Sequence, residues 1–191
     1  MSKTIRIGSG AAWWGDRVEP AALNAEAGQL DYLCFETMAE ATVSAAQVRT
    51  RRDPAFPGYD TYLDDRMRAV LPACMRRGTR IVSNQGWINP DGAAQRIVHW
   101  LREFGFRGVK VAAVNGSLIT DRVLDLTDRI LENGKPTHTL AATLISAEAY
   151  LGAEQIVEAL REGARIVVTG RVADPSIFMA PMMHEFGWDA L

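Results

Sequence analysis

The sequence has little of what marks several large classes of protein. Its 191 residues include 2 cysteines, and its 21 basic and 23 acidic residues leave a formal net charge of -2. Cys34 and Cys74 lie far apart and form neither a disulfide framework nor a metal-binding Cys-x-x-Cys pattern, so a reducing cytoplasm is the expected location. The near-neutral charge speaks against a nucleic-acid protein, because such proteins carry a basic surplus.

Other signals are missing as well. No run of about 18 apolar residues occurs, so we predict no membrane span, and the first residues lack the apolar centre of about 7 to 15 residues that a signal peptide needs. The 3 histidines show no ligand spacing, since Trp188 stands where an HExxH motif would place its second histidine. The G-x-S-x-G nucleophile elbow is absent. We therefore expect neither a metal site nor a familiar nucleophile.

The composition that is present, 48% hydrophobic and 23% charged, is that of an ordinary globular protein. We expect residues 1–191 to form a single α/β domain. Short segments rich in Ile, Val and Leu, with little alternation, are typical of strands buried on both faces of a parallel sheet. The predicted strands are residues 3–8, 31–36, 80–83, 109–114, 139–145 and 165–169.

Helical patterns separate these strands. They cover residues 62–77, 90–104, 121–132, 152–162 and 175–178, and Pro181 is expected to break the last helix. The alternation predicts a Rossmann-like fold, a mostly parallel open sheet of about five to six strands with helices on both faces. The first part of a (β/α) barrel is the alternative, because a strand spacing of about 30 residues fits both folds.

Capping residues define several of the predicted boundaries. Asn89 is the expected N-cap of one helix and Thr120 that of another. Glycine is expected to turn the chain from helix into strand in a left-handed conformation at Gly78, Gly108 and Gly163.

Ligands of parallel α/β sheets bind at the carboxyl ends of the strands, so the residues directly after each strand are informative. Here all six such loops are polar and rich in glycine. Caps and turns use the same residue types, but six loops of this kind at one edge favour a shared ligand site. The predicted ligand-binding residues are Gly8, Ser9, Gly10, Trp13, Trp14, Asp16, Arg17, Thr37, Asn84, Asn115, Tyr150 and Gly170.

The first loop resembles a dinucleotide fingerprint only in part. Gly8-x-Gly10 follows the first predicted strand, and Glu36 ends the second, where a ribose-binding carboxylate would stand. Trp13 replaces the third glycine, and its side chain prevents the close approach of helix and strand that an NAD site needs. The backbone N–H groups of the loop can still hold a phosphate or a carboxylate, so CoA or a nucleotide remains a candidate ligand.

The residues after the fingerprint have two interpretations each. Trp13 and Trp14 suit stacking on an adenine or an acyl chain, while the alternative is that at least one ring seals the edge of the core. Asp16 and Arg17 either pair with each other, or Arg17 meets an anion.

Three residues are candidates for catalysis. Glu36 is the predicted general base in preference to Glu40, which is explained as a first-turn acid that complements a helix dipole. Arg171 comes directly after a strand and either forks a carboxylate or phosphate or pairs with Asp174. Asp174 also fits the N-cap position before Pro175.

Several stretches resemble the acyclic terpene utilisation (AtuA) family, in the order the family has them. They are residues 7–20 (IGSGAAWWGDRVEP), 31–40 (DYLCFETMAE), 149–154 (AYLGAE), 168–176 (VTGRVADPS) and 184–188 (HEFGW). The chain departs from the family pattern at residues 85–87 and at Glu148, which puts Glu148 in doubt as a shared functional residue.

The resemblance implies a bacterial cytoplasmic protein linked to acyl-CoA catabolism of terpenoids and branched acids, often beside biotin-dependent carboxylases. It assigns no catalytic residue, and it implies that residues 1–191 are the N-terminal portion of a longer architecture. We therefore expect a protein that binds or acts on an acyl-CoA or small carboxylate, a small anionic metabolite. A non-catalytic nucleotide or CoA module and an assembly subunit are the alternatives. A homo-oligomer, or association with the C-terminal portion, is the expected assembly.

Overall fold

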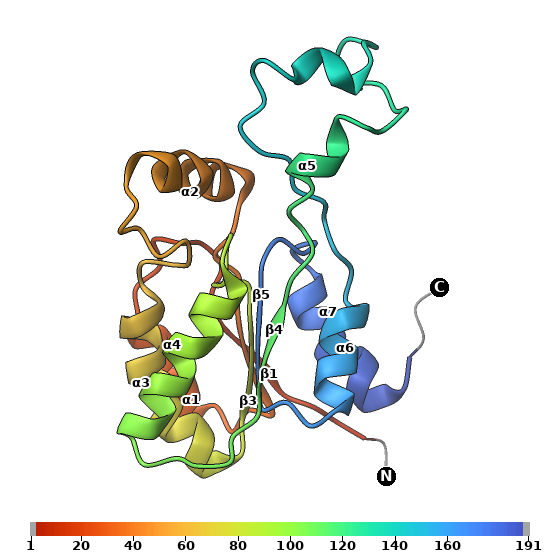
Figure 1. The fold of residues 1–191 in the computed structure, drawn as a ribbon. Helices are drawn as coiled ribbons and strands as arrows, with labels where there is room; N and C mark the ends of the chain where they lie inside the picture. The colour runs from red at the N-terminus through yellow and green to blue at the C-terminus, as the bar shows by residue number, and fades with distance from the viewer. Residues whose placement is uncertain (1–2, 189–191) are drawn as a thin grey trace.

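The computed structural model describes residues 3–188, and their strands form one sheet (Figure 1). The strands are β1 (Ile7–Ala11), β2 (Tyr32–Phe35), β3 (Arg80–Ser83), β4 (Val111–Val114) and β5 (Ile166–Thr169). The helices are α1 (Glu19–Ala27), α2 (Glu40–Arg52), α3 (Leu63–Arg77), α4 (Pro90–Glu103), α5 (Thr120–Val123), α6 (Glu154–Arg161) and α7 (Ser176–Phe186), with a 3-10 turn, η1 (Thr137–Leu140).

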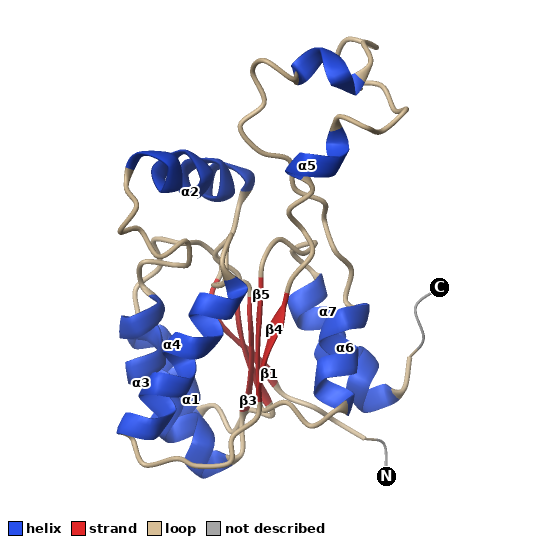
Figure 2. Ribbon diagram, viewed as in Figure 1, coloured by secondary structure: helices blue, strands red, loops and turns tan. Residues whose placement is uncertain are grey.

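The sheet is open, and its strand order is β1-β2-β3-β5-β4. Every neighbouring pair is parallel. Helices α1, α3 and α4 cover one face, and α6 and α7 cover the other (Figure 2). The predicted α/β class, the parallel open sheet and the three layers are thus confirmed.

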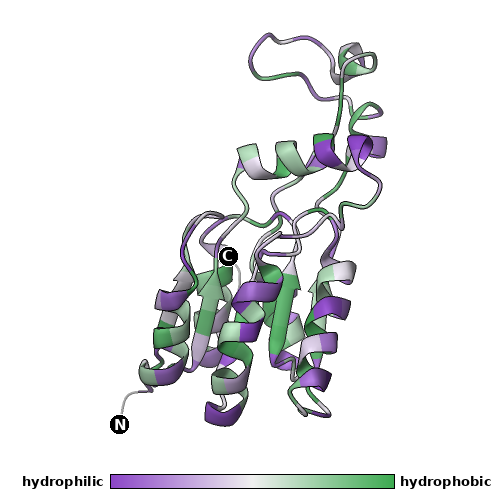
Figure 3. Ribbon diagram, turned by 90° about the vertical axis from the view of Figure 1, so that its left-hand side faces the viewer, coloured by the Kyte–Doolittle hydropathy of each residue, from purple (hydrophilic) through white to green (hydrophobic). Residues whose placement is uncertain are grey.

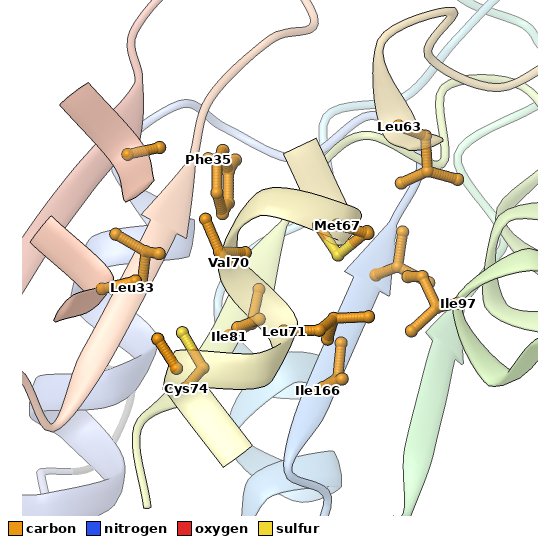
Figure 4. Packing of buried hydrophobic residues seen from close by; sticks show 14 of the residues in the cluster. Leu33, Phe35, Leu63, Met67, Val70, Leu71, Cys74, Ile81, Ile97 and Ile166 are labelled. Carbon is orange, nitrogen blue, oxygen red and sulfur yellow. The ribbon is translucent and has the colours of Figure 1, made fainter. Parts of the chain in front are cut away.

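Successive strand residues point to opposite faces of the sheet, so each strand contributes side chains to two hydrophobic cores. On one face Leu33 and Phe35 pack with Met67 and Val70 of α3 (Figure 4). On the other face Cys34 packs among the residues of α6 and α7. The strands are therefore hydrophobic along their length, while the helices keep polar residues outside (Figure 3).

Several predicted boundaries are confirmed. The Asn89 side chain accepts a hydrogen bond from the Gly92 N–H at 2.9 Å and caps α4. The three predicted joint glycines have left-handed backbones, with φ of 82° at Gly78, 70° at Gly108 and 88° at Gly163. A side chain at these positions would be strained.

Both predictions for residues 121–145 are wrong. The helix ends at Val123 after one turn, and Thr120 Oγ1 accepts a hydrogen bond from the Ala147 N–H instead of capping it. The predicted strand at 139–145 lies outside the sheet. Local bonds hold it in turns, since Thr139 Oγ1 donates to the Pro136 carbonyl and the Leu144 N–H to the Leu140 carbonyl. Such local partners compete with a strand ladder.

Helix α1 was not predicted, and α2 was anticipated only through its first turn, where Glu40 was expected and lies. Their buried positions hold small residues, such as Ala21 and Ala25 in α1 and Ala46 in α2. A stripe of alanines gives a weak periodic signal.

The last helix also differs from the prediction. It continues through Pro181 to Phe186, and the carbonyl of Ile177, which Pro181 leaves without its N–H partner, accepts a hydrogen bond from the Cys34 thiol at 3.3 Å. Asp174 does not cap this helix, because the N-cap is Pro175.

The segment from 115 to 152 leaves the carboxyl edge of the sheet, extends above it in Figure 1 and returns to α6. It contacts α2 on the way, since Arg51 donates to the Ile145 carbonyl at 2.5 Å and Gln47 to Glu148 Oε1 at 2.9 Å. Within residues 3–188, no helix is long and apolar enough to cross a bilayer.

Candidate functional site

The loop between β2 and α2, residues 36–39, lies at the carboxyl edge of the sheet. Glu36 Oε1 accepts hydrogen bonds from the Met38 N–H at 3.0 Å and from Asn84 Nδ2 at 2.8 Å. Asn84 Oδ1 accepts one from the Thr37 N–H at 2.7 Å. Thr37 and Asn84 are buried, and Glu36 is half-buried. Three of the predicted site residues thus lie together, and in this structure they hold the loop in place.

Arg171 reaches the same loop from the opposite side. Its guanidinium is 1% exposed, donates to the Met38 carbonyl and pairs with Asp174, whose side chain is 59% exposed. This is the pairing that the sequence left as one of two alternatives. With the guanidinium covered, Arg171 acts through its neighbours.

One of those neighbours is Tyr150, whose ring lies 4.1 Å from the Arg171 guanidinium carbon. The Tyr150 hydroxyl donates to Glu40 Oε1 at the start of α2. This hydrogen bond lowers the pKa of the Glu40 carboxyl and raises the pKa of the Tyr150 hydroxyl. Glu40 is therefore a carboxylate at neutral pH and Tyr150 a neutral phenol. We call Glu40, Tyr150, Arg171 and Asp174 the edge cluster.

Arg171, which stacks on Tyr150, and Glu148, which accepts a hydrogen bond from Gln47, each carry one buried polar atom without a hydrogen-bond partner within residues 3–188. These atoms are Arg171 Nε and Glu148 Oε2. A buried polar group that the protein itself does not satisfy is a position where water or a ligand completes the bonding.

The glycine loop predicted after residue 8 is wrong, because Gly8 and Gly10 lie inside β1. Gly8 pairs with Leu33 and Ser9 with Cys34 in the parallel ladder. A Cβ at Gly8 would lie 2.4 Å from Leu30, and one at Gly10 would lie 2.4 Å from the Phe35 ring. The glycines therefore permit close packing at the positions where a phosphate loop was expected.

Other predicted residues lie apart from the edge cluster. Asn115 is exposed and donates to Asp91 at the start of α4. Gly170 is buried where loops meet, and a Cβ there would lie 2.9 Å from the Trp87 carbonyl oxygen. Arg17 is exposed on another depression, which it shares with Arg68.

The loop that carries Trp13 and Trp14 is held by hydrogen bonds to the side chains of Asp16 and Arg66. Asp16 Oδ2 accepts hydrogen bonds from the Ala12 and Trp13 N–H groups at 2.7 and 3.0 Å, in place of a pairing with Arg17. Arg66 Nη2 donates to the carbonyls of Trp14 and Asp16 at 2.6 and 3.2 Å.

The Arg66 guanidinium is itself paired with Asp60 at 2.5 Å, and both side chains are fully buried. Gln85 Nε2 donates to the same Asp60 oxygen at 2.9 Å. Burial raises the pKa of the Asp60 carboxyl, and Arg66 opposes that rise. Breaking a buried ion pair leaves an uncompensated charge in the core. Because Arg66 also binds the carbonyls of Trp14 and Asp16, the conformation of the tryptophan loop depends on this pair.

A groove of about 340 Å³ opens between this loop and α2. We call it the tryptophan groove. Its aromatic lining is Trp13, Trp14, Phe56 and Trp87. The α2 residues that line it are Ala41, Thr42, Ala45, Ala46 and Arg49, and Thr61 completes it.

Trp13 is 59% exposed, whereas Trp87 is 4% exposed and Phe56 7% exposed. Of the two interpretations of the tryptophan pair, packing at the edge of the core describes Trp14, and stacking on a ligand stays a prediction for Trp13. Trp14 packs on Trp87 and Tyr62, and Trp13 stands at the mouth of the groove.

Sequence reasoning missed part of this edge. It named Glu40 only as a first-turn acid, which is the position Glu40 has in α2, and it did not name Arg49, Phe56 or Trp87 as site residues. Trp87 offered a signal, since it follows a strand and stands in a stretch that departs from the family pattern. Arg49 and Phe56 offered none, because Arg49 lies in the part of α2 that was not predicted and Phe56 follows the end of that helix.

Comparisons with known proteins agree with the resemblance. The model of the family described as "Acyclic terpene utilisation family protein AtuA" matches residues 5–191. Neither a curated protein nor a solved structure matches the chain. Because the family model spans nearly the whole sequence, the chain belongs to the acyclic terpene utilisation family AtuA.

Proposed function

We propose that the protein binds and acts on an acyl-CoA or small carboxylate metabolite of terpenoid or branched-acid breakdown at the carboxyl edge of its sheet. Membership of the acyclic terpene utilisation family supports the pathway. The observation that carries the proposal is the edge cluster, where the 52% exposed Tyr150 bonds to Glu40 above a buried guanidinium.

The cluster offers a proton donor beside a proton acceptor. Tyr150 holds its proton because its pKa is raised, and Glu40 is ionised because its pKa is lowered. When a substrate carbonyl replaces Glu40 as the acceptor of the Tyr150 hydrogen bond, the phenol polarises that carbonyl and the released Glu40 carboxylate can accept a proton from the carbon next to it. We assign these two tasks to Tyr150 and Glu40.

This pair is positioned by the other two residues of the cluster, Arg171 and Asp174, and by Glu36 of the adjacent loop. Arg171 stacks under the Tyr150 ring and pairs with Asp174, so it orients the phenol without touching a ligand. Glu36 accepts a hydrogen bond from the N–H of Met38 and so holds the loop that leads into α2. We therefore assign Arg171, Asp174 and Glu36 positioning roles.

The charge of the edge favours one form of the metabolite. Within the edge cluster, Glu40 and Asp174 supply two carboxylates against the single guanidinium of Arg171. A free carboxylate would be repelled here, whereas the carbonyl of a thioester is uncharged. An acyl-CoA therefore suits the edge cluster better than a free acid.

Calorimetry with isobutyryl-CoA, isobutyrate, CoA and ATP tests the proposal. We expect isobutyryl-CoA to bind more tightly than CoA, and Tyr150→Phe to weaken that binding about tenfold through loss of one hydrogen bond to the carbonyl. Tyr59→Phe, at a half-buried tyrosine of the α3 side, is the matched control and should bind like the wild type. Equal affinity of Tyr150→Phe and wild type would overturn the proposal. Equal affinity for ATP and isobutyryl-CoA would instead indicate a nucleotide-binding module.

A further inference from the structure

We infer that the tryptophan groove binds an apolar chain that ends in an anionic group, with the chain along α2 and the anion at Arg49. The inference rests on the proposed function, because it describes the class of ligand that would bind at the same carboxyl edge of the sheet. Four features of the groove carry it.

The first feature is that the groove is open because α2 has small side chains there. Ala41 and Ala45 lie one helical turn apart on the side that faces the aromatic rings. Leucines at these positions would fill the space against Trp14 and Phe56. The volume of about 340 Å³ falls at the lower end of the range of small-molecule sites, roughly 300 to 1,000 Å³.

The second feature is the chemistry of the walls. Aromatic rings and alanine methyl groups present apolar surface, and burying it is favourable in proportion to the area removed from water. Trp13 keeps 59% of its surface exposed at the mouth, where a ligand chain would cover it.

The third feature is that the walls are held before any ligand arrives. Asp16 fixes the backbone at Trp13, and the fully buried Arg66 fixes the carbonyls of Trp14 and Asp16. A groove whose walls are already ordered loses little conformational entropy on binding. The network therefore suits a binding site better than a mobile surface loop.

The fourth feature is charge at one end. Arg49 lines the groove, and its guanidinium carbon lies 4.4 Å from the Phe56 ring centre. Arg52 follows in the last turn of α2, and the ion pair of Arg49 with Asp53, at 3.8 Å, is weak because both side chains are about half exposed. This end of the groove is complementary to a carboxylate or a phosphate.

Together the four features define a ligand with an apolar chain and an anionic end. From Arg49 such a chain extends along Ala45 towards Ala41, which is next to Glu40 of the edge cluster. Two sources of this chemistry exist, a free chain acid and an acyl-CoA, whose anionic groups are its phosphates.

The experiment uses the complete chain and four probes, namely dodecanoate, octanoate, dodecanol and dodecanoyl-CoA. Binding is measured by calorimetry and by tryptophan emission, because Trp13, Trp14 and Trp87 line the groove. We expect a blue shift on binding, and affinity that falls roughly fourfold for each methylene removed. Dodecanoate or dodecanoyl-CoA, whichever binds more tightly, identifies the source of the anion.

Two groove variants test the location. Ala45→Trp fills the groove from an exposed helix position, and we expect it to weaken dodecanoate at least tenfold. Ser44→Trp adds the same ring at the neighbouring exposed position outside the groove lining, and it should bind like the wild type. Ala41→Trp serves as a second filling variant if Ala45→Trp unfolds at a lower temperature than the wild type. Unchanged affinity in a folded filling variant would overturn the inference.

One more variant tests the charge. Arg49→Gln should weaken dodecanoate about tenfold and leave dodecanol unchanged, because only the acid carries a charge. Equal losses for both probes would contradict an anion at Arg49. Tyr150→Phe separates this inference from the proposed function. If it alters isobutyryl-CoA binding but the filling variants leave dodecanoate unchanged, the proposed function stands and the groove inference fails. The reverse pattern rejects the proposed function alone.

Discussion

The two sides of α2 differ in kind. One side faces the aromatic rings of the tryptophan groove with alanines, and its contacts there are apolar. The other side faces residues 145–150 through hydrogen bonds, from Arg51 to the Ile145 carbonyl, from Gln47 to Glu148 and from Tyr150 to Glu40. A single helix thus separates an apolar groove from a polar cluster at the same edge of the sheet.

The comparison shows how differently the two sides are stabilised. The groove side depends on a fully buried ion pair and on aromatic packing, which are parts of the core. The polar side depends on groups that are largely exposed, such as Tyr150 and Glu40. Exposed polar contacts contribute little to stability, so the polar side is free to exchange its partners with a ligand.

The largest effect is expected from breaking the groove side at Arg66. Arg66→Met leaves the Asp60 carboxyl buried without its cation, and we expect a loss of about 3 to 5 kcal/mol in the free energy of unfolding. Urea denaturation measures it, and tryptophan emission should shift as the carbonyls of Trp14 and Asp16 lose their donor.

Arg68→Met on the same helix is the control for Arg66→Met. Arg68 is exposed, and its removal should cost less than about 1 kcal/mol. Replacing both partners, as Arg66→Met with Asp60→Leu, should recover much of the loss, since no buried charge is left. A loss at Arg66 no larger than that at Arg68 would contradict the role given to the buried pair.

An intermediate effect is expected at β1, below the tryptophan loop. Gly10→Ala places a methyl group 2.4 Å from the Phe35 ring, so we expect a loss of about 1 to 3 kcal/mol in stability. Ser9→Ala, at the adjacent exposed residue, is the control and should be nearly neutral. Thermal unfolding compares the two variants. If Gly10→Ala is as stable as the wild type but loses ligand affinity, the packing role is wrong and the phosphate-loop interpretation returns.

Much of the sheet could be predicted because its signals are local. Strands β2, β4 and β5 are nearly continuous apolar segments, and Asn89 and Gly78 mark helix ends by their own backbone chemistry. The failure at 139–145 has the opposite cause. Its apolar residues suit a strand, but whether they join a sheet depends on partners elsewhere in the fold.

The candidate site was less predictable for the same reason. Helix α2 is held by contacts with residues about a hundred positions away, with separations of 94 for Arg51 and Ile145 and 101 for Gln47 and Glu148. Polar residues after each strand correctly indicated a polar edge that includes Glu36, Asn84 and Arg171. The sequence could not show that these residues hold a loop, because their partners are backbone groups of residues 37 and 38.

The smallest effect is expected on the polar side, at Glu40. The Tyr150 hydroxyl lowers the pKa of Glu40 below its ordinary value of 4.5. Because the folded pKa is the lower one, the contact stabilises the folded chain fully above about pH 4.5 and this contribution is lost as the pH falls through the folded pKa. Glu40→Gln should therefore lower the urea midpoint slightly at pH 7, and this difference from the wild type should be smaller at pH 3, which is below the unfolded pKa.

Glu158→Gln, at an exposed glutamate of α6, is the control for general charge effects. Tryptophan emission should stay constant in Glu40→Gln at pH 7, because the groove lies on the opposite side of α2 from Tyr150. An equal change in midpoint at both pH values would mean that Glu40 contributes through packing and not through its charge. A shift in tryptophan emission would mean that the two sides of α2 are coupled, and the edge cluster and the tryptophan groove would then have to be treated as one site.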